Sequence, residues 1–295
     1  MEPNLEILPP PKSKLKKDKY DKINHHLFKP DFIYIIYGPC HSGKSYVLNK
    51  MITDKNFYKG VFSQIIMISA TISHDETLKD INRNDNIIKI TSGLNKLDEI
   101  MESIIELRTH DMEMGPVGKM LIVFDDCIQY LHERGFINGW ISTFRHYKCS
   151  LIFTTQSFKK LPTSVRALTS GYLLFRTNNK KEKTDMIDEV SESFPNSFTK
   201  IYEQVTAKKF QFLFIDMKSC KLYKNFTTLL YDADTYAETI DKYTEYIDQM
   251  RKSHHNVVND VSHDNTMVIA KKHLDEFEYL KLLYYKLKND HNHKN

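Results

Sequence analysis

The residues best suited to chemistry lie in one short stretch, which begins at Gly38 and ends with Gly43, Lys44 and Ser45. The stretch reads GPCHSGKS and fits the spacing G-x-x-x-x-G-K-[ST]. Glycines at these positions allow a tight turn whose backbone N–H groups point inward as an anion-binding nest. The lysine ammonium would reach the terminal phosphates of a nucleotide, and the serine hydroxyl would ligate Mg²⁺. The spacing therefore predicts a phosphate-binding loop.

The segments on both sides of this loop agree with that prediction. Before Gly38 the chain reads FIYIIY, an apolar and aromatic run typical of a buried strand. After Ser45, apolar residues recur at helical spacing, so bound phosphates would also sit at a helix N-terminus. The alternative is an ordinary turn that contains glycine, which does not account for the strand and the helix. The predicted nucleotide-binding residues are Gly38, Pro39, Cys40, His41, Ser42, Gly43, Lys44, Ser45 and Tyr46.

Two carboxylates follow the apolar segment MLIVF, at Asp125 and Asp126. Open α/β sheets bind their ligands at the carboxyl ends of parallel strands, so these acids are expected beside the phosphate-binding loop. Asp125 is predicted to hold Mg²⁺. Asp126 is predicted to orient and deprotonate an attacking water. The alternative for Asp126 is that it caps a helix beginning near Cys127. One carboxylate could also have both roles.

A third polar position follows the apolar segment LIFTT, at Gln156. The same edge argument places Gln156 near a γ-phosphate, where its amide would sense that phosphate or align the water. The alternative is a strand-end amide without such a role. Arg145 precedes this segment and Arg166 follows it, and either could project to a neighbouring subunit's nucleotide as an arginine finger. The alternative for both arginines is a solvated surface position.

These residues need a parallel sheet to hold them, and strand and helix patterns alternate from Asp31 to about Lys224. The pattern predicts an α/β fold with helices on both faces of the sheet. Expected strands cover residues 62–69, 87–90, 120–124, 151–155, 172–175 and 210–215, and expected helices cover 94–107 and 180–190. Beyond Tyr231 two apolar stripes predict a pair of helices. We therefore divide the chain into a basic N-terminal arm (1–30), an ATPase domain (31–230) and a helical C-terminal extension (231–295).

Charge and composition restrict the surroundings of the protein. The net charge of +4 is mild, but lysines are concentrated between residues 12 and 19 of the N-terminal arm. This arm would contact nucleic-acid phosphates or serve only as a solubilising end. The four cysteines are far apart and form no C-x-x-C pair, which argues against a zinc site or a disulfide framework and predicts an intracellular, reducing compartment. No apolar run reaches the ~18 residues of a membrane span, and the first residues lack the apolar region of a secretion signal.

Taken together, the motifs resemble the HerA/FtsK-type genome-packaging ATPases that poxviruses, other large DNA viruses and virophages encode. The resemblance covers about residues 30–225. It rests on GPCHSGKS, on the strand ending in Asp125 and Asp126, and on the Arg145-His146 pair before a strand ending in Thr155-Gln156. A late strand ending in Asp216, followed by the basic and aromatic YKNF, also belongs to it.

The resemblance implies a P-loop NTPase of the RecA-like, additional-strand type, with a mainly parallel sheet. By position, Lys44 and Ser45 would hold ATP and Mg²⁺, and Asp125 would complete the metal site. Asp126 stands where many relatives outside the viruses have glutamate, which has a longer reach. Gln156 matches the family's sensor, and Arg145 matches its candidate finger acting in trans.

The resemblance also implies a function and partners. Such ATPases are ring-forming homo-oligomeric motors that move double-stranded DNA into a preformed capsid, so capsid or portal-vertex proteins are expected partners. For a viral protein, the expected location is the host cytoplasm, in the virus factory, and the virion. Two alternatives stay open: a DNA helicase or remodelling ATPase, and a nucleotide-binding assembly protein with little turnover.

Overall fold

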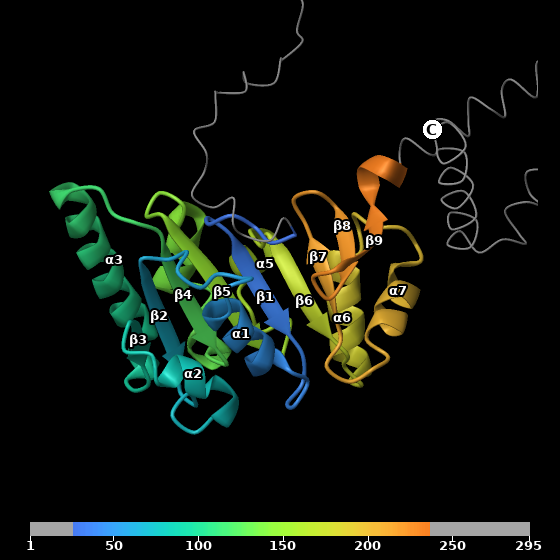
Figure 1. Ribbon diagram of the computed structural model, residues 1–295, viewed down its shortest axis with the longest axis horizontal. Helices are drawn as coiled ribbons and strands as arrows, with labels where there is room; N and C mark the ends of the chain where they lie inside the picture. The colour runs from blue at the N-terminus through green and yellow to red at the C-terminus, as the bar shows by residue number, and fades with distance from the viewer. Residues whose placement is uncertain (1–25, 237–295) are drawn as a thin grey trace, which may run out of the picture.

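The computed structural model describes residues 26–236, which form one sheet with helices packed on both of its faces (Figure 1). The strands in this part are β1 (Ile33–Tyr37), β2 (Gln64–Ser69), β3 (Ile87–Ile90), β4 (Met120–Asp125), β5 (Cys149–Thr155), β6 (Gly171–Phe175), β7 (Phe212–Asp216), β8 (Lys221–Lys224) and β9 (Thr228–Asp232). Their order across the sheet is β3-β2-β4-β5-β1-β6-β7-β8-β9.

The α-helices of the described part are α1 (Lys44–Thr53), α2 (Lys79–Asn82), α3 (Leu97–Met114), α4 (Phe136–Trp140), α5 (Thr163–Ala167), α6 (Lys180–Val190) and α7 (Phe198–Val205). Single turns of 3₁₀-helix occur at η1 (Glu76–Leu78), η2 (Leu94–Lys96), η3 (Ile128–Tyr130) and η4 (Ile141–Thr143). None of the helices described is both long and apolar enough to span a membrane.

The strands β3, β2, β4, β5, β1 and β6, which follow one another across the sheet, are all parallel. In this order β5 lies between β1 and β4. The strand that feeds the glycine-rich loop is thus separated by one additional strand from the strand that ends in Asp125. This order confirms the predicted fold class, a mainly parallel sheet of the RecA-like, additional-strand type. Because parallel strands all point the same way, the carboxyl ends of β1, β4 and β5 meet at one edge of the sheet.

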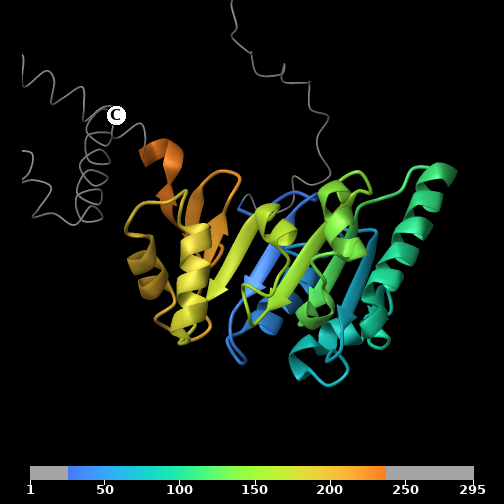
Figure 2. The same ribbon diagram turned by 180° about the vertical axis from the view of Figure 1, so that it is seen from behind.

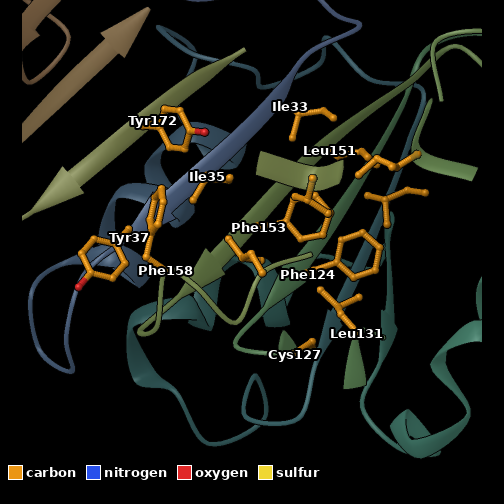
Figure 3. Packing of buried hydrophobic residues seen from close by; sticks show 14 of the residues in the cluster. Ile33, Ile35, Tyr37, Phe124, Cys127, Leu131, Leu151, Phe153, Phe158 and Tyr172 are labelled. Carbon is orange, nitrogen blue, oxygen red and sulfur yellow. The ribbon is translucent and has the colours of Figure 1, made fainter. Parts of the chain in front are cut away.

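Alternation along the strands sends side chains into two separate cores. Ile33, Ile35 and Tyr37 of β1 pack with apolar residues of α3 to α7, and Figure 3 shows some of the residues of this cluster. Tyr34 and Ile36 pack on the opposite face with residues of α1 and α2. Figures 1 and 2 show the same division from the two sides of the sheet. Burial on both faces explains why β1, β4 and β5 read as continuous apolar runs in the sequence.

The predicted helices are present, with one difference in length. α6 has the predicted bounds and begins where the Asn179 side chain accepts hydrogen bonds from the N–H groups of Lys181 and Glu182. The helix expected over residues 94–107 begins with the turn η2 and continues as α3 to Met114, before Gly115. It extends further than predicted because its last two turns are mostly exposed and polar, and so lack an apolar pattern.

The end of the sheet differs more from the sequence pattern. β7, β8 and β9 are antiparallel, and β8, β9 and α7 were not predicted. β8 and β9 are short and half-exposed, so their apolar residues do not form the continuous runs that mark β4 and β5.

The ends of the described part bear on the division of the chain into segments. Leu27 and Phe28, which precede the assumed start of the ATPase domain, already pack in the core, and β9 continues to Asp232. The basic arm up to residue 25 and the predicted helices beyond residue 236 lie outside the described residues. The three-part division of the chain stays a prediction.

Gly171, the first residue of β6, provides a test of this packing. A Cβ at this position would lie 2.7 Å from Phe28 Cε2 and 2.9 Å from the Ile215 carbonyl oxygen. Since a backbone atom cannot move away freely, Gly171→Ala is expected to lower the free energy of unfolding by about 1–3 kcal/mol in urea denaturation. Gly139→Ala in α4 is the control, because no atom lies within 4 Å of its added Cβ. Equal stability of the two variants would contradict this account of the sheet.

Candidate functional site

The glycine-rich loop connects β1 to α1 in a conformation that requires its glycines. A Cβ on Gly38 would lie 2.7 Å from both Phe175 Cβ and Ser42 Oγ, and Gly43 has a φ of 111°. The Gly38 N–H donates to the Thr155 carbonyl at 3.1 Å, which ties the loop to β5. No side chain caps the N-terminus of α1 at Gly43, so its first N–H groups are free to bind an anion.

The Lys44 side chain is folded over this loop. Its Nζ donates to the carbonyl oxygens of Gly38 at 2.8 Å and Pro39 at 3.1 Å. Burial lowers the pKa of Lys44, and the nearby carboxylates of Asp126 and Asp125 oppose that shift. The ammonium therefore lies within electrostatic range of both predicted acids.

Asp125 is buried at the end of β4 and is held from both sides by hydroxyl groups. Ser69 Oγ at the end of β2 donates to Oδ2 at 2.9 Å, and Thr154 Oγ1 on β5 donates to Oδ1 at 2.7 Å. The strand register sets both residues directly opposite Asp125. Burial raises the pKa of Asp125, whereas the two hydrogen bonds favour its carboxylate form. Asp125 is thus fixed in place at the edge of the sheet.

The donors at this edge fit Mg²⁺ held together with a nucleotide. Mg²⁺ prefers oxygen ligands and is commonly bound by one or two carboxylates plus substrate phosphates and water. Ser45 in the first turn of α1 and Asp125 supply such oxygens. Within residues 26–236 no group of three or more His, Cys, Asp or Glu residues is placed to hold a metal ion. Ser45 and Asp125 fit Mg²⁺ because each offers an oxygen ligand, and bound phosphates and water would supply the others.

Asp126 and Gln156 are joined by a hydrogen bond that reaches back to the loop. Gln156 Nε2 donates to Asp126 Oδ2 at 3.1 Å, and Cys40 Sγ donates to Gln156 Oε1 at 3.0 Å. The Asp126 backbone has a φ of 48°, and its N–H donates to Thr154 Oγ1 at 3.0 Å. Cys127, not Asp126, is the N-cap of η3, and no side chain caps that turn. The structure thus brings Cys40, Gln156 and Asp126 together and does not use Asp126 as a helix cap.

Two residues of this site were missed by the sequence analysis, Ser69 and Thr154. Both stand at the carboxyl ends of apolar strands, which is the signal that identified Asp125 and Gln156. They were overlooked because a hydroxyl residue in a strand is common and by itself indicates no chemistry.

Comparisons with known proteins address the fold. No protein-family model and no curated protein matches the sequence. The genome-packaging NTPase B204 of Sulfolobus turreted icosahedral virus 2, solved with AMPPCP, is similar over 66% of this chain and 97% of its own, with 19% identity and a TM-score of 0.52. B204 of Sulfolobus turreted icosahedral virus, a DNA-packaging ATPase, is similar over 67% and 98%, with 21% identity and a TM-score of 0.52.

The chain has the fold of a genome-packaging NTPase. The similarity covers nearly the whole of both viral proteins, whereas about a third of the present chain has no counterpart in them. At these identities the likeness extends to the fold and leaves the chemistry to be argued from the site.

The two candidate arginines lie in different surroundings. Arg145 precedes β5 and is therefore at the opposite edge of the sheet from the glycine-rich loop. Its side chain is exposed, and its guanidinium lies 5.4 Å from the centroid of the neighbouring Phe144 ring. Arg166 is nearly buried, forms an ion pair with Glu189 and donates to the Leu161 carbonyl at 3.1 Å. Arg166 is therefore engaged within its own chain, whereas the Arg145 side chain is exposed.

Thr154 connects both acids and allows a test of the site's construction. Thr154→Val keeps the shape of the side chain but removes the donor to Asp125 and the acceptor for the Asp126 N–H. Unsatisfied buried groups of this kind cost about 1–3 kcal/mol, so the free energy of unfolding is expected to fall by that amount in urea denaturation.

The matched control is Thr109→Val on the exposed side of α3, where the hydroxyl donates only to the Ile105 carbonyl of its own helix. This control is expected to change the free energy of unfolding by less than about 0.5 kcal/mol. The same loss in both variants would mean that Thr154 does not support the two acids.

Proposed function

We propose that this protein hydrolyses ATP with Mg²⁺ and uses the energy to move double-stranded DNA into a preformed viral capsid. The observation that carries the proposal is that three features lie at one edge of the sheet. They are the glycine-rich loop, Asp125 with the two hydrogen bonds that it accepts, and the hydrogen-bonded pair of Gln156 and Asp126. Each of these parts has a separate task in phosphoryl transfer. The likeness to viral packaging NTPases supports the choice of DNA packaging over other uses of this fold.

Binding of the triphosphate would rest on the loop and on Lys44. The backbone N–H groups at the start of α1 would donate hydrogen bonds to the phosphate oxygens, and the ammonium would exchange its bonds to Gly38 and Pro39 for bonds to phosphate. Ser45 and Asp125 would hold Mg²⁺, which neutralises charge on the phosphates when bound. These contacts position the terminal phosphate toward β4 and β5.

Asp126 would act on the attacking water. One of its oxygens accepts from Gln156, and the other accepts no hydrogen bond from the described residues. That free oxygen is available to take a proton from water. Gln156 spans the distance between the loop and Asp126, so a γ-phosphate that draws its amide away from Asp126 would change the acid's surroundings. In this way Gln156 would couple nucleotide binding to activation of the water.

Coupling to DNA would involve more than one subunit. Arg145 lies away from its own loop, so any role in hydrolysis must be at the nucleotide of a neighbouring subunit in a homo-oligomeric ring. The loop after Gln156 carries Lys159 and Lys160, which we propose as contacts for DNA phosphates. Both lysines are exposed, and Lys159 Nζ lies 3.6 Å from Glu189 Oε2.

The first test is steady-state ATP hydrolysis with and without double-stranded DNA. DNA is expected to stimulate turnover, and Lys44→Ala is expected to lower it by at least about 100-fold, because charge stabilisation at the transferred phosphate is lost. ATP binding without turnover, indifferent to DNA, would contradict the motor and favour the nucleotide-binding assembly protein. Turnover accompanied by strand separation would favour the helicase.

Asp126→Asn tests the proposed base separately. Asparagine tolerates a φ of 48°, so the variant is expected to keep the fold and to bind ATP normally. Turnover is expected to fall by about 10²–10⁴-fold, the usual contribution of a general base. Asp111→Asn on the exposed side of α3 is the control for the charge change. Unchanged turnover in Asp126→Asn would exclude Asp126 as the base.

A further inference from the structure

Phe210 lies at the rim of the glycine-rich loop, in the turn between α7 and β7. A Cβ placed on Gly43 would lie 3.2 Å from Phe210 Cδ1 and 3.4 Å from Phe175 Cε1, so both rings stand beside this glycine. Phe175 is buried, whereas the Phe210 side chain is 59% exposed. Phe210 is the exposed phenylalanine among residues 26–236, and it is found next to the phosphate-binding loop. An aromatic ring left in water at this place indicates a surface for a ligand.

The backbone of Phe210 supports the same interpretation. Its φ is 68°, a conformation that is unfavourable for a bulky residue. The turn is fixed on both sides, because the Gln211 N–H donates to the Lys208 carbonyl at 3.3 Å and the Phe212 N–H donates to Asn225 Oδ1 at 3.2 Å. Glycine or asparagine would fit this turn without strain. Strain of this kind is retained mainly where a side chain has a task in binding or catalysis.

The position of Phe210 also agrees with the direction in which a nucleotide must lie. The groups proposed to act on the terminal phosphate, Asp125, Asp126 and Gln156, stand on the β4 and β5 side of β1. Phe210 stands on the other side of β1, before β7 and beside β6. A nucleotide with its terminal phosphate toward Gln156 therefore extends its sugar and base away from β5. The ring of Phe210 lies along that direction.

We propose that the Phe210 ring is a stacking platform for the base of the bound nucleotide. This inference rests on the proposed function and adds to it how the base is held. Lys209 Nζ now lies 4.8 Å from the centroid of the ring, and because Lys209 is itself exposed, a base can replace it on that face. Stacking uses the π-face that every base has, so the platform is expected to bind different bases with similar affinity.

The test compares two probes by calorimetry in the presence of Mg²⁺: AMPPCP, which carries a base, and inorganic tripolyphosphate, which does not. Phe210→Ala is expected to weaken AMPPCP binding by about 5- to 100-fold, in line with the loss of one base–aromatic stack, and to leave tripolyphosphate binding unchanged. Phe210→Trp is expected to restore AMPPCP binding. AMPPCP and GMPPCP are expected to bind the wild type within about a factor of ten of each other.

Two further variants separate binding from folding. Phe210→Gly suits the positive φ, so it is expected to fold with an unchanged or higher Tm and to show the same selective loss of AMPPCP binding. Leu107→Ala removes another exposed apolar side chain, on α3, and is expected to bind both probes like the wild type.

Other outcomes would overturn the platform. Equal weakening of both probes by Phe210→Ala would mean that the ring only shapes the loop, and no weakening of either would mean that it has no role. Both results leave the proposed ATPase intact, since wild-type binding of AMPPCP that Lys44→Ala removes would still stand. Failure of the wild type to bind either probe would instead overturn the proposed function together with the platform.

Discussion

The register between β4 and β5 is the constraint on which the site depends. It sets Asp125 opposite Thr154, so that one hydroxyl donates to Asp125 and accepts from the N–H of Asp126. The register between β2 and β4 adds Ser69 from the other side. A slip of one residue would turn these side chains to the wrong face of the sheet. The apolar faces of β4 and β5, buried in two cores, prevent such a slip, so packing far from the site fixes its geometry.

Several unfavourable features lie at this edge and are maintained by that packing. Burial raises the pKa of the Asp125 carboxyl group. His41, Asp126 and Phe210 have φ values of 60°, 48° and 68°, and positive φ also occurs away from this edge, as at Lys148 before β5. Each feature costs free energy that the hydrophobic cores must offset. The strained residues at this edge differ from the others in their position beside the glycine-rich loop.

The sequence was most informative where a local residue pattern is typical of one kind of structure. Continuous apolar runs ending in polar residues predicted the parallel strands and, with them, the meeting of Asp125 and Gln156 at the glycine-rich loop. Phe210 could not be found in this way, because β7 returns antiparallel beside β6 and only this long-range pairing brings the ring to Gly43. The location of Arg145 at the opposite edge follows from its place before β5.

The most direct test of the account is a crystal structure of the full chain with AMPPCP and Mg²⁺. We expect the phosphates to occupy the loop of residues 38–45, Ser45 and Asp125 to lie in the coordination sphere of the metal, and the terminal phosphate to face Gln156. A nucleotide bound elsewhere, or one in the loop with its terminal phosphate turned away from β5, would contradict the central claim that this sheet edge is where ATP is hydrolysed.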